Sequence, residues 1–393
     1  MLIEIALFLL LGITAGTITG MIPGIHINLI GAFLVSLSAT SFFLNPTYLV
    51  VFISSMAITH TFIDFIPSIF LGCPDTDTEL SILPGHEMLK KGLGYEAIIL
   101  TAYGSLAAIA ILGVILLPSL LIISKTYELI KNIIPYLLII TSILLISLEK
   151  KKLPALGVFL LTGILGLLIL NTELKEPLLP LLTGLFGSSM LIISIKNKTK
   201  IPPQIISKPK TNLFRPMLGA LIASPLCSFL PGLGSGQASI IGNLISKTDR
   251  KGFLALLGAT NTLVMGFSFI SLYVISKTRT GAAAAIQNII GTLSWEIFIL
   301  IIISIFISGF IAFFLTIFLA KSFSKILDKL NYTKLSYVTL FLLSIVVLLV
   351  SGPIGFLILI ISTLTGIYCI SLNVRRTNMM GCLLIPVIIF YLL

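Results

Sequence analysis

Two Pro-Gly steps interrupt long apolar stretches of this sequence, in GMIPGIHIN at residues 20–28 and in FLPGLGSGQ at residues 229–237. Proline breaks a helix, and a helix that restarts after the break presents free backbone N–H groups and a partial positive charge. Glycines let the backbone approach a ligand closely, and the nearby His, Asn, Ser and Gln side chains add donors. The breaks therefore predict a site for a carboxylate or a phosphate, with kinks that serve only close packing as the alternative. The expected substrate-binding residues of the two breaks are Pro23, Gly24, His26, Asn28, Pro231, Gly232, Gly234, Ser235, Gly236 and Gln237.

Arg279 lies in a further interruption, SKTRTGAAAA at residues 276–285. Its guanidinium could hold a carboxylate or a phosphate by two parallel hydrogen bonds, so we assign it to the same substrate site. A surface basic residue beside Lys277 is the alternative.

His60 and Asp64 are one helical turn apart in an apolar stretch, so they share a helix face. An ionisable residue at membrane depth is functional by default, because an unpaired carboxylate there is costly. Asp64 is expected to take up and release a coupling proton, with His60 as its partner. The alternative is a buried hydrogen-bonded pair that locks two helices.

Asp75 and Asp77 alternate with threonines in CPDTDTE at residues 73–79. An extended loop would place these acids on one side, where they could bind a hard cation, so both join the candidate coupling residues. A solvated acidic loop is the alternative. We expect no cofactor and no resident metal, and H+ or Na+ as the coupling ion.

Enzymatic chemistry finds little support in the sequence. All three histidines fall in the first half of the chain, and no His-Glu-x-x-His pair is present. Ser235 is flanked by glycines, but no histidine lies in its half of the chain to act as a base. A membrane-embedded hydrolase is therefore the less favoured hypothesis, and we expect that the protein is not an enzyme.

The elements that position these residues are membrane helices. The 393 residues are 57% hydrophobic and 10% charged, with a mean hydropathy of +1.16, whereas soluble domains are about 25% charged. Residues 5–63 contain no Asp, Glu, Lys or Arg, and a single span needs about 20 residues. The sequence predicts an all-α, multi-pass protein of the cell membrane with 10 to 12 transmembrane segments.

The net charge of +11 lies in loops, in the basic runs Glu149–Lys152, Lys196–Arg215, Lys321–Lys334 and Arg375–Arg376. Such runs mark the cytoplasmic face of a membrane protein, and they are not expected to bind nucleic acid. The apolar runs between them then form out-and-back hairpins, one over 153–195 and one over 335–374 that turns at Gly352-Pro353.

The chain contains similar features twice. Small residues recur every fourth position before each Pro-Gly step, and a polar triplet precedes each later interruption (Thr59-His60-Thr61 and Thr260-Asn261-Thr262). Paired interruptions in two halves are typical of transporters with discontinuous helices. We predict two inverted membrane repeats, 1–170 and 215–393, joined by a hairpin and basic cytoplasmic linker at 171–214.

The breaks, the segment CPDTDTELSILPGHEMLKKG and the second copy resemble the large membrane subunit of the tripartite tricarboxylate transporters. Residues 85–92 (GHEMLKKG) match the end of the loop motif of that family. The resemblance implies a secondary carrier for carboxylates that works with a small membrane subunit and an extracytoplasmic binding protein. The sequence departs from the family at His26 and Asn28, and at the acids of residues 75–79.

The expected function is therefore secondary transport of a small organic anion, coupled to an ion or a proton, with the substrate between the two breaks. The alternative is a carrier or flippase for polyprenyl phosphate or another lipid phosphate. The expected partners are the lipid bilayer and the two accessory subunits, and a homodimer is left open.

Overall fold

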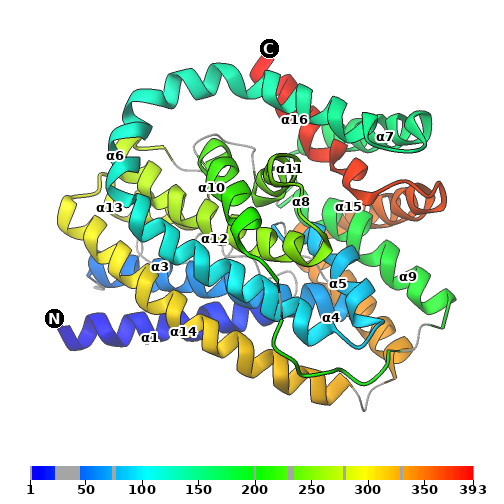
Figure 1. Ribbon diagram of the computed structural model, residues 1–393, viewed down its shortest axis with the longest axis horizontal. Coiled ribbons are helices and arrows are strands. Elements are labelled where there is room, and N and C mark those ends of the chain that lie inside the picture. The colour runs from blue at the N-terminus through cyan, green and yellow to red at the C-terminus, as the bar shows by residue number, and fades with distance from the viewer. Residues whose placement is uncertain are drawn as a thin grey trace. The chain divides into compact units, whose positions relative to one another are not determined.

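The computed structural model describes the chain except for residues 1, 23–44, 73–76, 175, 199–200, 210, 229–233, 278–279, 328–330 and 393. Within the described residues 86% are helical and none lies in a strand, which confirms the all-α prediction (Figure 1). The first half of the chain forms α1 (Leu2–Met21), α3 (Pro46–Ile63), α4 (Phe65–Leu71), η1 (Glu79–Ser81), α5 (Ile82–Leu89), α6 (Gly94–Ser147), α7 (Lys152–Leu170), α8 (Leu178–Leu182), η2 (Thr183–Ser188) and α9 (Ser189–Lys196). The second half forms α10 (Phe214–Ser228), α11 (Ser235–Ser246), α12 (Arg250–Ile275), α13 (Gly281–Ile290), α14 (Trp295–Leu327), α15 (Tyr332–Ser371), η3 (Arg376–Met380) and α16 (Gly381–Leu392).

Eight helices in the described part of the chain are long and apolar enough to cross a membrane. They begin at residues 2, 46, 94, 152, 178, 250, 295 and 332, and the second of them joins α3 to α4. Three shorter apolar helices accompany them. The chain is thus a multi-pass membrane protein, and the count of 10 to 12 segments stays a prediction because residues 23–44 are outside the described part.

The chain folds into two compact units, each built from separate segments. The first unit comprises 1–66, 98–130 and 209–320, and the second comprises 67–97, 131–208 and 321–393. Each unit therefore contains segments from both predicted repeats, and each is described by itself below. The repeat boundaries remain predictions.

In the first unit, a stripe of glycines on α1 packs against α3 (Figure 1). A Cβ atom added to Gly16 would lie 2.4 Å from the carbonyl oxygen of Met56, and one added to Gly12 would lie 2.4 Å from that of Phe52. Gly20 faces Ile63 in the same way. The absence of side chains on this stripe lets the two backbones approach closely, as the every-fourth-residue spacing predicts.

A second close contact in the same unit joins α6 to α12. A Cβ atom added to Gly104 would lie 2.0 Å from the carbonyl oxygen of Ala255, and one added to Gly258 would lie 2.0 Å from that of Thr101. Ser105 Oγ donates a hydrogen bond of 3.0 Å to the carbonyl of Gly258. These contacts hold α12, which carries one of the two polar triplets, against α6.

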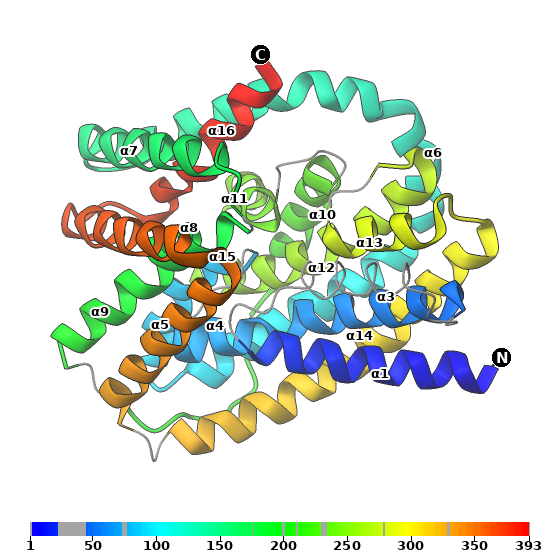
Figure 2. The ribbon, with the colours of Figure 1, turned by 180° about the vertical axis from the view of Figure 1, so that it is seen from behind.

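In the second unit, α15 is divided at the predicted Gly352-Pro353 turn (Figure 2). Gly352 adopts φ +68° and ψ −170°, a conformation open essentially to glycine alone, and Pro353 cannot donate a helical hydrogen bond. The part of α15 after this break packs against η2, where Gly184 faces Ser362. η2 itself is a π-helical segment, a feature that occurs often at functional sites.

Candidate functional site

Eight of the predicted site residues lie outside the described residues, so no geometry is available for them. They are Pro23, Gly24, His26, Asn28, Asp75, Pro231, Gly232 and Arg279. The structure describes the other predicted site residues. Gly234 to Gln237 lie at the second break, His60 lies on α3, Asp64 lies at the end of α3, and Asp77 precedes η1.

The second break leads into α11. Gly234 is the N-cap residue, in an extended conformation, and its N–H donates to Gln237 Oε1 at 2.7 Å. Gln237 thus closes the start of its own helix, and Ser235 and Gln237 are each 1% exposed. Ser239, one turn later, hydrogen-bonds to Thr260 of α12 through the two hydroxyls, at 2.6 Å.

Asp64 lies where α3 gives way to α4, inside the candidate span Pro46–Leu71. Pro67 has no N–H to donate to the carbonyl of Ile63, so the regular helix ends there. The N–H of Asp64 donates to the carbonyl of His60 at 3.0 Å, and its side chain is 3% exposed. The sequence thus places a buried carboxylic acid at a local break in a membrane helix.

Two of the four predicted coupling residues, His60 and Asp64, contact different helices of the first unit. His60 Nδ1 shares a 2.9 Å hydrogen bond with Thr19 Oγ1 of α1. Asp64 Oδ2 accepts a 2.9 Å hydrogen bond from Asn261 Nδ2 of α12. We name His60, Asp64, Thr61, Asn261 and Thr262 the α3–α12 polar cluster.

The structure brings the two polar triplets of the repeats together. Thr61 and Thr262, the last residues of the triplets, hydrogen-bond through their hydroxyls at 3.2 Å. The amide of Asn261 also lies 3.5 Å from the carbonyl oxygen of Thr61. The sequence identified both triplets but contained no signal that they would meet.

A second polar region lies in the second unit, around His86 of the GHEMLKKG motif. His86 is 1% exposed, and its Nε2 lies 3.3 Å from the hydroxyl of Tyr332. Burial, followed by the charges of Lys90 and Arg376, lowers the pKa of His86 to about 3. His86 is therefore a neutral side chain at any physiological pH. Asp77 is half-buried on the loop that precedes η1 in the same unit.

Arg376 is a residue to which sequence analysis gave no individual role. It begins η3, outside the eight candidate spans, and burial lowers its pKa to about 10. The sequence shows only a pair of arginines at a helix start, which is typical of a topology signal. Burial of one of them depends on packing that the local sequence does not contain.

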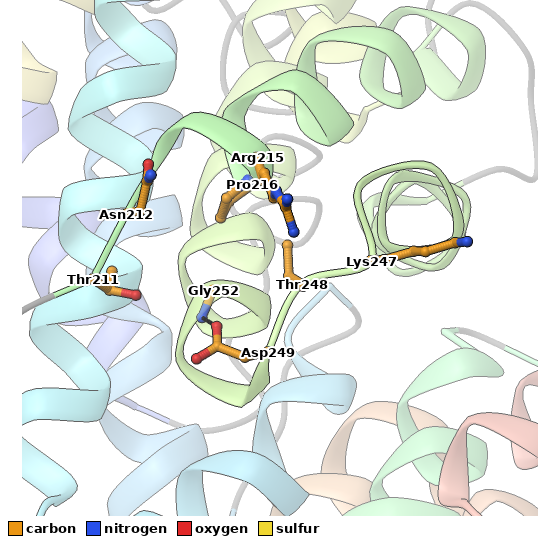
Figure 3. Close-up of a pocket in the computed structure, with 8 residues that line it drawn as sticks. All are labelled: Thr211, Asn212, Arg215, Pro216, Lys247, Thr248, Asp249 and Gly252. Atoms are coloured by element: carbon orange, nitrogen blue, oxygen red, sulfur yellow. Dashed lines mark hydrogen bonds between the residues drawn. The ribbon is translucent and has the colours of Figure 1, made fainter.

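Helix starts also line a cavity of 430 Å³ in the first unit (Figure 3). Arg215 points towards Thr248 there, whereas Lys247 extends away from the other lining residues. Asn212 Oδ1 accepts the N–H of Phe214, and Asp249 Oδ1 accepts that of Gly252. Caps from the chain itself therefore close both helix starts at this cavity. Its lining residues are Thr211, Asn212, Arg215, Pro216, Lys247, Thr248, Asp249 and Gly252.

Among the described residues, no group of three or more His, Cys, Asp or Glu side chains is placed to hold a metal ion. The described cysteines Cys227, Cys369 and Cys382 are buried and form no disulfide with one another.

Comparison with known proteins gives two matches over nearly the whole chain. The model of the tripartite tricarboxylate transporter TctA family matches residues 6–381. An uncharacterized protein of Methanocaldococcus jannaschii, MJ1079, is 33% identical over 405 residues, which cover 98% of each chain. No solved structure matches the chain.

Proposed function

The chain belongs to the tripartite tricarboxylate transporter TctA family, and from this premise we propose that it is a secondary carrier for an organic anion of the carboxylate class. The family match carries the transport function, and the eight apolar helices agree with a multi-pass membrane subunit. Transporters of this family act with a small membrane subunit and a binding protein, so we propose the same partners for this chain.

The α3–α12 polar cluster supports the proposal that transport is coupled to H+ or Na+. Asp64 is a buried carboxylic acid within a candidate span, and such residues commonly carry protons or bind ions in transporters. Its partner Asn261 comes from the other predicted repeat. A change in the packing of α3 against α12 would therefore change the hydrogen bonding of Asp64, and coupling requires such a link.

The contact between Thr61 and Thr262 supports a two-fold relation between the two proposed repeats. In a two-fold arrangement, equivalent residues of the two copies contact each other only at the axis. These two threonines occupy the same position in the two triplets, and their hydroxyls are 3.2 Å apart. We place the axis between these two threonines.

The proposal is tested with the Asp64→Asn variant in proteoliposomes. We expect uphill accumulation of the anion to be abolished, because an amide cannot carry a proton, whereas exchange of the anion across the membrane persists. Glu173→Gln makes the same chemical change at an exposed loop residue and should retain both activities.

Two results would contradict parts of the proposal. Equal loss of accumulation and exchange in Asp64→Asn would make Asp64 structural, because the variant then leaves a buried partner unsatisfied. Transport of a polyprenyl phosphate, with no uptake of carboxylates by the complete three-subunit system, would favour the lipid-phosphate alternative.

A further inference from the structure

Arg376 carries a hydrogen-bond donor that has no partner among the residues described by the structure. Its Nη2 contacts the thioether sulfur of Met190 at 3.0 Å, and sulfur of this kind is a weak acceptor. Its Nη1 is buried and has no hydrogen-bond partner among the residues that the structure describes. Buried polar groups normally have partners, so this donor on a charged group points to an acceptor that the described part of the chain does not supply.

The neighbouring arginine, Arg375, has different surroundings from Arg376. Arg375 is 67% exposed, and its Nε lies 3.6 Å from Glu149 Oε1. The N–H of Arg375 and Nδ2 of Asn378 donate to the same carboxylate oxygen, at 3.2 and 3.1 Å. Glu149 therefore neutralises Arg375 and fixes the start of η3. The Nη1 donor of Arg376, the next residue, has no hydrogen-bond partner in the described part of the chain.

The charges around Arg376 keep it a cation. Burial lowers the pKa of Arg376 to about 10, and the charge of Glu87 acts in the opposite direction, so the side chain is protonated at neutral pH. The nearby His86 is neutral, and Lys90 adds a further positive charge. An anion that reached Nη1 would therefore meet the positive charge of Arg376 and, close by, the negative charge of Glu87.

Two further polar atoms of the second unit lie on α15, which contacts η3, and on η2, which contacts α15. Ser362 Oγ is on α15, which contacts both η2 and η3, and Ser188 Oγ is on η2. Both hydroxyls are buried and have no hydrogen-bond partner in the described part of the chain. They are donors of the kind that accompanies a guanidinium in an anion site.

We infer that Arg376 binds a carboxylate group of a soluble organic anion through its guanidinium. A planar carboxylate matches two parallel N–H donors, and one such group neutralises one guanidinium. The choice of a carboxylate over other oxyanions rests on the proposed function. This assigns a carboxylate-binding residue to the second unit.

The test compares two adjacent arginines in the purified full-length protein. Succinate is titrated against wild type, Arg375→Gln and Arg376→Gln, and binding is followed by isothermal titration calorimetry and by the thermal transition. We expect wild type and Arg375→Gln to bind alike and the Kd of Arg376→Gln to rise about 10- to 100-fold, as for the loss of a charged hydrogen bond. Arg376→Lys keeps the charge and loses the fork, so we expect an intermediate Kd.

Arg376→Met, which fills the buried volume, shows whether loss of binding reflects misfolding, since it should remain monodisperse and still fail to bind.

Inorganic phosphate and a short-chain phosphatidate are titrated as separate arms. Equal succinate affinity in wild type and the Arg376 variants, or no binding of succinate by wild type, overturns the inference. The transport assay of the Asp64→Asn variant tests the proposed function independently of this binding experiment. Binding of phosphatidate but not succinate overturns both the inference and the carboxylate proposal.

Discussion

His86 shows how burial controls the charge of a single side chain in this protein. The imidazole is 1% exposed and has a pKa of about 3, far below the usual value near 6.5. The folded protein therefore keeps His86 neutral, whereas the unfolded chain protonates it below about pH 6.5. Protons bind preferentially to the unfolded state between these two values, so acidification destabilises the fold.

We expect the stability of the wild-type protein to fall as the pH is lowered from 6.5 towards 3, by up to about 1.4 kcal/mol per pH unit from this group. His86→Gln removes this contribution and should have a flatter profile. The measurement is the temperature at which half of the detergent-solubilised protein aggregates, at pH 7.5, 6 and 5, read by size-exclusion chromatography. Parallel profiles for the two proteins would contradict the buried, neutral imidazole.

At the scale of elements, glycines decide where helices break and where they approach each other. Gly352 breaks α15 because its φ and ψ are accessible to glycine, whereas Gly157 is an ordinary residue within α7. A Cβ atom added to either residue would meet nothing within 4 Å. The two positions therefore differ in backbone conformation but not in available space.

Gly352→Ala should destabilise the protein by about 1 to 3 kcal/mol, because alanine is strained at a positive φ with ψ near 180°. Gly157→Ala should be neutral or stabilising by up to about 1 kcal/mol, because alanine favours the helix interior. Thermal transitions of both variants check the pair. If Gly352→Ala melts like Gly157→Ala, the break at residue 352 is not a feature of the folded protein.

At the scale of the whole molecule, the basic runs determine which ends of the helices face the cytoplasm. The run at residues 149–152 precedes α7, and the run that begins at residue 196 follows α9. The apolar elements α7 to α9 between these runs form an out-and-back hairpin by sequence. Its loop at residues 171–177 should therefore lie on the opposite side of the membrane.

Single cysteines at Lys151, Thr172 and Asn197, all exposed, test this arrangement in a background without native cysteines. In intact cells a membrane-impermeant maleimide should label the cysteine at 172 and not those at 151 and 197. Inverted membrane vesicles should give the reverse pattern and provide the control. Labelling of all three positions from the same side would contradict the predicted topology.

The sequence predicted the features that depend on local pattern. Apolar runs gave the helices, the spacing of Gly12, Gly16 and Gly20 indicated a close helix contact, and Gly352-Pro353 marked a break. These predictions succeed because a helix in a membrane must satisfy the hydrogen bonds of its own backbone. The local sequence pattern therefore determines the local structure.

The contacts between distant segments could not be predicted in the same way. Nothing near Thr61 indicates Thr262 as its partner. Arg375 and Arg376 have almost the same local sequence, although Arg375 is exposed and Arg376 is half-buried. Such differences arise from tertiary packing. The geometry of the first Pro-Gly break and of Arg279 stays a prediction, since those residues are outside the described part.

The length of α6 has a consequence for how the chain meets the bilayer. Its 54 residues, at a rise of about 1.5 Å each, measure roughly 80 Å, and a hydrocarbon core is about 30 Å thick. Tilting alone does not absorb such a mismatch. The charged positions of this helix after its first turn fall between residues 125 and 131, and apolar stretches lie on either side. This charged stretch should therefore sit at the headgroup level, at the end of the apolar stretch Gly94–Tyr127, which is long enough to cross the membrane.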